Sequence, residues 1–236
     1  MSIWAAKRFW QSASVQPVDG GYSVTLDSRT VKTPAKATLV TPTQAMAEAV
    51  AQEWDAQEGT IDPAGMPVTR AVNAAIDKVS IQFAEVADML AAYGDSDLTC
   101  YRADSPDSLV ARQAETWDPF LDWAHDRFNA RLIPVQGVMH QAQKPDALQR
   151  LAEPLYRMTP FELTAMHDLI SLSGSLVIGL AASEDAFAIP DLWQASRLDE
   201  IWQIEQWGED EEATQQAAIK EQAFYDAYRF LCLTRE

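Results

Sequence analysis

The chain has 236 residues, of which 47% are hydrophobic, and it carries a formal net charge of −17 at pH 7. This length and apolar fraction are typical of a folded protein of one or two domains, and they exclude wholesale disorder. The negative charge argues against nucleic acid and anionic membranes as partners, because both need Lys and Arg to neutralise phosphate. It is compatible with a basic protein partner.

The charge is distributed unevenly along the chain. Residues 1–36 contain five bases and two acids, whereas residues 184–222 contain eleven acids and two bases. We therefore expect two parts of different charge. The two cysteines, Cys100 and Cys232, have neither a CxxC pattern nor a metal-like spacing, which favours a reduced intracellular chain.

The sequence contains no run of about 18 apolar residues, so we expect no membrane insertion. The opening residues, MSIWAAKRFW, have neither the apolar centre of a signal peptide nor an Arg- and Ser-rich transit pattern. We therefore expect a cytoplasmic protein, or one whose leader has already been removed.

The first predicted elements are strands of a small antiparallel sheet. Tyr22, Val24 and Leu26 alternate with small polar residues, as in a half-buried strand. Residues 27–29 are turn formers, and residues 30–33 return as a hairpin arm. A sheet of this size requires a covering element, because its apolar face would otherwise be exposed.

A helix is predicted to follow, with Thr41 as its cap and Gln44 closing a capping box. Its inward face covers the sheet and carries Met46, Ala49, Val50 and Trp54. Gly and Pro residues between positions 59 and 67 end this helix, and we place the domain boundary there. Residues 1–66 then form a β-rich domain with one helix, and residues 67–236 form an α-helical domain.

Helical patterns continue through the second part of the chain. Apolar residues recur at helical spacing from Val68 to Tyr93, and further helices are expected to start near Pro106, Pro119 and Pro145. Residues 159–162, TPFE, form a second capping box. The helix that it opens is apolar nearly all round as far as Ala182, which predicts a central helix surrounded by others. The predicted fold class is α+β, with a small N-terminal antiparallel sheet and covering helix before a larger all-α domain.

Residues 196–213, SRLDEIWQIEQWGEDEEA, combine apolar anchors with carboxylates. Four apolar side chains mark one stripe at helical spacing: Ile201, Trp202, Ile204 and Trp207. Gly208 interrupts, and four acids follow without a base: Glu209, Asp210, Glu211 and Glu212. The structural interpretation is that the tryptophans pack into the core and that the acids form a solvated first helical turn. The functional interpretation is a partner-binding surface made of Trp202, Trp207, Glu209, Asp210, Glu211 and Glu212.

We expect no catalytic residue, metal or cofactor. The three histidines, His125, His140 and His167, are widely separated, and a structural or surface role is favoured for each. No phosphate-binding loop or nucleophile elbow occurs. Residues 171–175, SLSGS, are predicted to let the apolar helix pack closely. A hydrolase or transferase using two carboxylates about 5–10 Å apart in a cleft stays open, as does an acidic adaptor for some other basic protein.

Several segments, spread in order over nearly the whole chain, resemble the ATP12 family of assembly chaperones for the F1 sector of ATP synthase. They are KRFW, GYSVTLDSRTVKTPAK, the EW of Glu53-Trp54, MPVTRAVNAAID, DLTCYRA, WDPFLDWA, HDLISLSGSLVIGLA and DEIWQIEQWGEDEEA. No single segment is a mechanistic motif, but the combined match is specific.

The resemblance implies a two-domain protein without enzymatic activity or bound nucleotide. It implies binding of the free F1 α subunit, which is shielded from aggregation until the β subunit replaces the chaperone. The acidic WG-x-x-E segment of the family corresponds here to Trp207, Gly208 and Glu211, in a more acidic context. We also expect a monomer. The resemblance, without the transit peptide of mitochondrial members, implies the bacterial cytoplasm or, for a processed eukaryotic form, the mitochondrial matrix.

Overall fold

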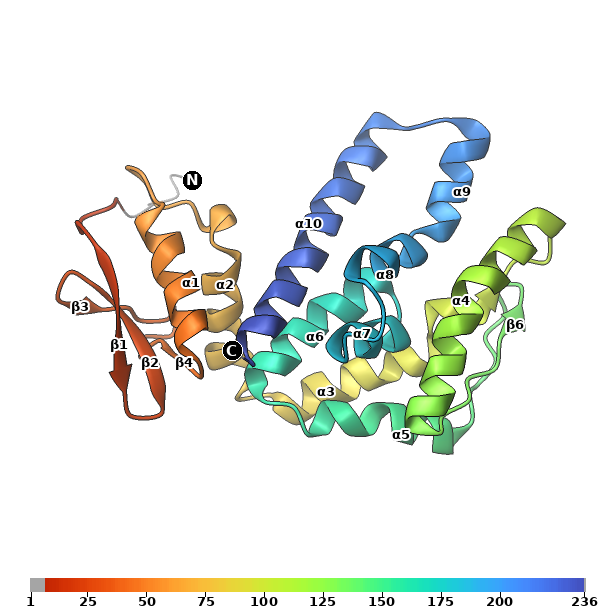
Figure 1. The fold of residues 1–236 in the computed structure, drawn as a ribbon, viewed down its shortest axis with the longest axis horizontal. Coiled ribbons are helices and arrows are strands. Elements are labelled where there is room, and N and C mark those ends of the chain that lie inside the picture. Colours follow the sequence, from red (N-terminus) through yellow and green to blue (C-terminus); the bar gives the residue numbers. More distant parts are fainter. Residues whose placement is uncertain (1–6, 236) are drawn as a thin grey trace. The chain divides into compact units, whose positions relative to one another are not determined.

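The computed structural model describes residues 7–235 and shows two compact units. Unit 1 comprises the described residues up to Phe83, together with Thr159–Ala165 and the C-terminal residues from Arg229. Unit 2 comprises Ala84–Met158 and Met166–Tyr228. An antiparallel sheet near the N-terminus precedes a mostly helical chain, which confirms the predicted α+β class (Figure 1). The domain boundary at residue 66 stays a prediction.

The sheet of unit 1 is built around its second strand, with which every other strand pairs antiparallel. Its strands are β1 (Ala13–Val18), β2 (Gly21–Leu26), β3 (Arg29–Thr30) and β4 (Val40–Thr41). Gly21 has a φ of +146°, and a Cβ there would lie 2.1 Å from the Thr41 carbonyl oxygen. Only glycine therefore lets β4 approach this closely.

Helix α1 (Gln44–Asp55) covers the sheet as predicted, and Met46 and Val50 on its inward face are fully buried. Its predicted cap was wrong. Thr43 is the N-cap, because its hydroxyl oxygen accepts from the Met46 amide at 3.2 Å. Thr41 belongs to β4, where its hydroxyl meets the Tyr22 and Thr43 carbonyl oxygens at 3.3 and 3.0 Å. The sheet therefore takes the hydroxyl that was expected to cap the helix.

The C-terminal end of α1 is held by the segment that precedes the sheet. The Arg8 guanidinium donates to the Asp55 carbonyl oxygen at 2.6 Å and to the Gln57 carbonyl oxygen at 2.8 Å. Trp10, which is buried, packs edge-on against Trp54 with ring centroids 5.2 Å apart. Arg8 thus bonds carbonyl groups at the end of α1, where they lack intrahelical partners, and Trp10 packs against the last turn.

Helix α2 (Pro67–Ala74) begins at a carboxylate of α1. The two oxygens of Glu53 accept the amides of Val68 and Thr69, each at 2.7 Å. A negative side chain at a helix start is favourable, because the first amides are unpaired and the helix dipole is positive there. Both residues of the Glu53-Trp54 pair therefore have structural contacts: Glu53 accepts the first amides of α2, and Trp54 packs edge-on against Trp10.

Unit 2 holds most of the remaining helices, and α6 and α10 contribute residues to both units. The helices are α3 (Phe83–Ala91), α4 (Asp107–Phe128), α5 (Pro145–Tyr156), α6 (Pro160–Ser173), α7 (Leu176–Ser183), α8 (Ile189–Ser196), α9 (Leu198–Trp207) and α10 (Glu211–Leu233). A short parallel pair, β5 (Tyr101–Arg102) and β6 (Val135–Gln136), joins them. Every residue of α7 is buried, so α7 forms the centre of this unit.

The central helix predicted from residue 160 to Ala182 is in fact two helices. Gly174 has a φ of +70° and ends α6, and the Ser175 hydroxyl caps α7 by accepting the Ile178 amide at 3.0 Å. The expectation that the SLSGS segment continues the helix was therefore wrong. Close packing comes instead from Gly179, because a Cβ there would lie 2.4 Å from Ile170 Cγ1.

A second correction concerns Pro119, which was expected to restart the chain. It lies inside α4, which runs without interruption through it. Pro119 and Glu115 are both exposed, so water can bond the Glu115 carbonyl group that loses its amide partner. The capping box at residues 159–162 is confirmed, with the Thr159 amide donating to Glu162 at 2.8 Å and the Glu162 amide to the Thr159 hydroxyl at 3.2 Å.

Candidate partner-binding site

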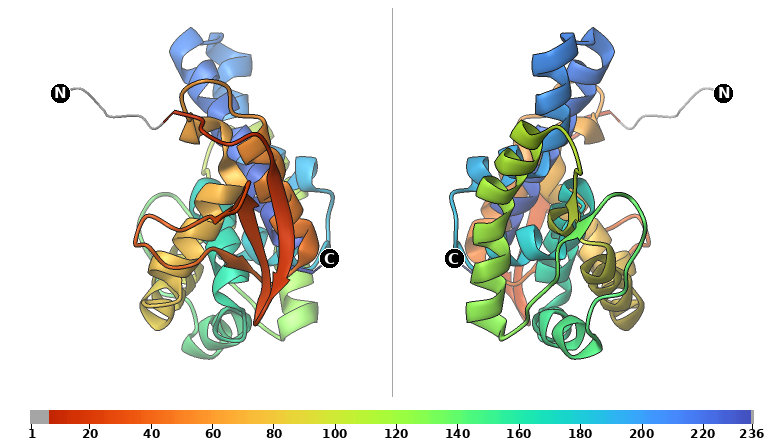
Figure 2. Two further views of the ribbon diagram at one scale, coloured as in Figure 1. Left: turned by 90° about the vertical axis from the view of Figure 1, so that its left-hand side faces the viewer. Right: turned by 90° about the vertical axis from the view of Figure 1, so that its right-hand side faces the viewer.

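Helices α9 and α10 meet in a turn at the end of a helical hairpin, at the top of Figure 1 and of both views in Figure 2. Gly208 ends α9 with a φ of +91° and donates its amide to the Ile204 carbonyl oxygen at 2.8 Å. Asp210 then starts α10, because its carboxylate accepts the Ala213 amide at 2.8 Å. Every residue from 203 to 216 is exposed. We call residues 203–216 the tip.

The apolar residues of the predicted stripe become more exposed toward the tip. Ile201 and Trp202 are half-buried, Ile204 is 37% exposed, and Trp207 is 79% exposed. The core interpretation is therefore wrong for Trp207. At this exposure the indole is open to contact by another molecule, as the aromatic anchors of protein interfaces are before binding.

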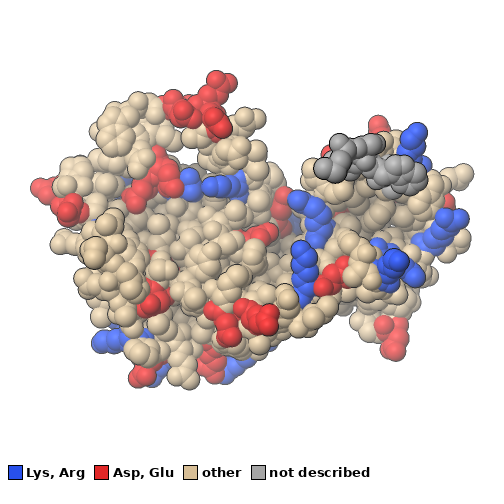
Figure 3. All heavy atoms as spheres, turned by 180° about the vertical axis from the view of Figure 1, so that it is seen from behind, with Lys and Arg blue, Asp and Glu red and all other residues tan. Residues whose placement is uncertain are grey.

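The four predicted acids follow Trp207 in sequence, after Gly208, and all are exposed. Asp210 is engaged as the helix cap, whereas Glu211 and Glu212 stand in the first turn of α10, where the helix dipole favours acids. Within residues 7–235, none of these four carboxylates forms an ion pair. Acidic side chains gather at the upper end of the face shown in Figure 3, where the tip lies.

Glu205 differs from these acids because it is already paired. Its two oxygens accept Nη1 and Nη2 of Arg112 on α4 at 2.6 and 3.0 Å. This hydrogen-bonded pairing holds the pKa of Glu205 below its ordinary value. Sequence reasoning missed Arg112 and its neighbour Gln113, which also bonds α9, because the partners lie 93 and 86 residues away and no local pattern marks them.

The histidines and cysteines form no centre with these acids. His140 bonds the Tyr101 hydroxyl at 3.1 Å, and His167 bonds Asp168 at 2.8 Å. Burial raises the pKa of the Cys100 thiol to about 12, with help from the charge of Asp97, so this thiol is not a nucleophile at neutral pH. Within the described part of the chain, no group of His, Cys, Asp and Glu side chains is arranged to hold a metal ion.

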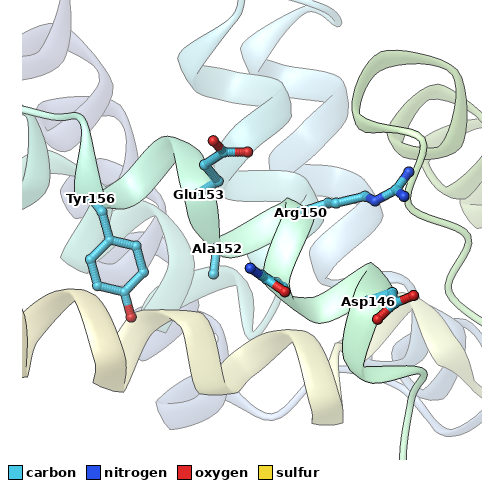
Figure 4. Close-up of a pocket in the computed structure, with 6 residues that line it drawn as sticks. Asp146, Arg150, Ala152, Glu153 and Tyr156 are labelled. Carbon is cyan, nitrogen blue, oxygen red and sulfur yellow. The ribbon is translucent and has the colours of Figure 1, made fainter.

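A hollow of about 550 Å³ lies along α5 and is shown in Figure 4. Three of the polar side chains that line it already have partners within the chain. Tyr156 donates its hydroxyl to Asp88 on α3, Arg150 donates to the Asn129 carbonyl oxygen at 3.0 Å, and Glu153 pairs with Arg157. The tip is therefore the stronger candidate. No helix between residues 7 and 235 has the length and apolar content needed to cross a bilayer.

Comparisons with known proteins agree with this architecture. A family model described as ATP12 chaperone protein matches residues 7–125. The crystal structure of Atp12 from Paracoccus denitrificans is 47% identical, with a TM-score of 0.95 over 98% of this chain and 99% of that one. A mutant of the same protein is 46% identical, with a TM-score of 0.95 over 98% of each chain.

Two further relatives extend the comparison. The Atu1473 protein of Agrobacterium tumefaciens is 42% identical, with a TM-score of 0.92 over 95% of this chain and 85% of that one. Protein atp12, mitochondrial, of Schizosaccharomyces pombe is 23% identical, covering 88% of this chain and 75% of its own length. Fold and sequence thus place the chain among chaperones. It belongs to the ATP12 family, and its function lies in ATP synthase assembly.

Proposed function

We propose that this protein binds the unassembled α subunit of the F1 sector and keeps it from aggregating until the β subunit takes its place. Membership of the ATP12 family supports the assembly role. A free subunit exposes an apolar interface that would otherwise associate with other chains. On this proposal the protein acts as a monomer in the cytoplasm, by binding alone, without a reaction or a cofactor.

The observation that carries the proposal is the composition of the tip. Trp207 is 79% exposed, and the four carboxylates from Glu209 to Glu212, which form no ion pair within residues 7–235, follow it after Gly208. Aromatic side chains dominate the binding energy of many interfaces, and complementary charges set orientation and association rate. In the proposed complex Trp202 and Trp207 contact apolar surface of the α subunit, while the acids face its basic groups. Such a mixed contact releases its client more readily than a purely apolar one.

The test is capture of the α subunit by variants of the tip. Glu211→Lys should lower the amount of soluble α subunit recovered with the protein in a pull-down after co-expression, because it places a cation against basic groups. Asp126→Lys is the matched control, since Asp126 is another exposed acid and lies on α4. Both variants should keep the circular-dichroism melt of the wild type.

Neutralisation separates charge from shape. A variant with Glu209→Gln, Asp210→Asn, Glu211→Gln and Glu212→Gln keeps a capping residue at position 210, because Asn caps as well as Asp. If this variant and Glu211→Lys both capture the α subunit as the wild type does, the tip is ordinary solvated surface. A dominant captured protein other than the α subunit would favour the acidic-adaptor alternative.

A further inference from the structure

One side of α4 makes a series of polar contacts with α8 and α9. At the buried end, the indole Nε1 of Trp117 donates to the Ala195 carbonyl oxygen at 2.8 Å. One helical turn earlier, the amide of Gln113 donates to Asp199 at 2.7 Å. Arg112 makes the outermost contact, with Glu205. The contacts therefore follow α9 from its start to within two residues of Trp207.

These contacts matter because apolar packing holds only the beginning of α9. Leu198 is the one buried residue of this helix. From residue 203 to the end of the helix every side chain is exposed, so packing contributes little there. The direction of the outer half of α9 is consequently set by the polar contacts to α4.

Gln113 is suited to this role because both ends of its amide are engaged. Its side chain is 2% exposed, its oxygen accepts the Ala103 amide at 2.7 Å, and its nitrogen donates to Asp199. Rotation of the amide would place donor against donor and acceptor against acceptor. The side chain therefore fixes Asp199 relative to α4.

Arg112 adds a geometric restraint farther out. Its two terminal nitrogens bond the two oxygens of Glu205 in parallel, an arrangement that fixes the plane of the carboxylate as well as its distance. A single point charge would hold the distance alone. The pair is exposed, with 36% and 45% of the two side chains accessible, so its effect is local rather than a large contribution to global stability.

We infer that Arg112 and Gln113 are positioning residues for partner capture, which act by orienting α9 and thereby presenting Trp207 and the acids of the tip. Neither residue needs to contact the partner. This inference rests on the proposed function, because it assigns a means of presentation to the same site.

Hydrogen exchange in the free protein, followed by capture of the α subunit, tests the inference. Arg112→Ala should raise amide exchange of α9 by roughly two- to fivefold, the scale expected from losing an exposed ion pair. Capture of the α subunit should fall, while exchange in α7 and the thermal melt stay unchanged. Arg127→Ala is the matched control. Arg127 lies on the same helix and forms an ion pair with Glu184, which is not part of α9.

The exchanged pair Arg112→Glu with Glu205→Arg should restore slow exchange and capture, because it rebuilds the ion pair with opposite polarity. Glu205→Gln removes the same ion pair from the other side and should likewise speed exchange of α9 and lower capture. If amide exchange of α9 is unchanged in both Arg112→Ala and Glu205→Gln, the Arg112–Glu205 pair does not orient α9. If exchange of α9 becomes faster while capture of the α subunit is undiminished, the orientation of α9 does not matter for binding. If the wild type itself fails to capture the α subunit, the proposed function fails, while the exchange measurements still decide whether α4 orients α9.

Discussion

The adjacent side chains of His167 and Asp168 on α6 show how a local contact shifts a titration. The hydrogen bond from the ring to the carboxylate raises the pKa of His167 above its ordinary value of 6.5, although partial burial acts in the opposite direction. Because the folded pKa exceeds the unfolded one, the contribution of this pair to stability is complete below pH 6.5. It is lost as the pH rises through the folded pKa.

Asp168→Asn should therefore lower the pKa of His167, measured by NMR titration of its imidazole protons. Removal of the carboxylate takes away both the charged hydrogen-bond acceptor and the attraction that favours the imidazolium. Asp126→Asn, an exposed substitution on α4, serves as the control. The same midpoint in the Asp168→Asn variant and in the wild type would refute the assigned cause.

At the residue scale, the sequence predicted which side chains are chemically conspicuous but not what they contact. The histidines were expected to be structural or on the surface, and the bonds of His140 and His167 agree with this. Asp97 was not singled out, yet it is fully buried and accepts the Ser175 hydroxyl and the Val177 amide at 2.7 and 3.0 Å. These two partners lie 78 and 80 residues away, and no local pattern encodes them.

At the element scale, α6 and α7 pack at a distance that only glycine permits. A Cβ on Gly179 would lie 2.4 Å from Ile170 Cγ1 and 3.4 Å from the Met166 methyl group. Gly179→Ala should therefore lower the free energy of unfolding by about 1–3 kcal/mol, the usual effect of overpacking a core, despite the better helix propensity of alanine. Urea denaturation measures the difference.

Gly65→Ala is the matched control for this prediction, because a Cβ there meets nothing within 4 Å and the backbone needs no positive φ. Ile170→Ala destabilises the core by itself, but Gly179→Ala should cost less in that background than in the wild type, since the obstructing methylene group is gone. Two glycine variants of equal stability would show that α7 moves to accommodate the added methyl group.

Elements whose signals are local were predicted well. The strand at residues 21–26 and the capping box at residues 159–162 each have signals within seven residues, and both elements are confirmed. The expected half-burial of that strand was wrong, because Ser23 and Thr25 are buried as well as Val24 and Leu26. Errors arose where a distant contact decided the outcome. Thr41 was expected to cap α1 but is taken by the sheet, and the break at Gly174 coincides with a hydrogen bond from the Leu98 amide to its carbonyl oxygen at 3.1 Å.

At the scale of the whole molecule, net charge and the tip act against each other. A side chain as exposed as Trp207 favours self-association, whereas a charge of −17 keeps copies apart at neutral pH. The sequence isoelectric point is about 4.4, where this repulsion vanishes. Sedimentation velocity should show oligomers as the pH is lowered toward that value.

Trp207→Ser should remain monomeric to a lower pH than the wild type, because it removes the most exposed aromatic side chain of the tip without changing the charge. Raising the salt concentration at neutral pH should act like acidification, since screening weakens the same repulsion. Identical sedimentation of wild type and variant at every pH would show that the tip is not the adhesive surface.

The candidate site could be predicted only in outline. Composition indicated the tryptophans and the acid block, and the resemblance selected Trp207, Gly208 and Glu211 within them. Neither could show that Trp207 is exposed, because helical periodicity places a residue on a face without saying what covers that face. The contacts from α4 were equally hidden, since they depend on a fold in which residue 112 meets residue 205.

Helix α9 has a buried side chain only at its first residue, Leu198, so a small tilt at that end moves the other end by a larger distance. From Leu198 to Trp207 the axis rises by about 14 Å, and a tilt of about 10° at the base would sweep the indole through about 2 Å. Small rearrangements beside α4 are thus magnified at the far end. A partner that displaces the Trp207 indole would also displace Glu205 relative to Arg112, so binding at the tip would be transmitted to α4.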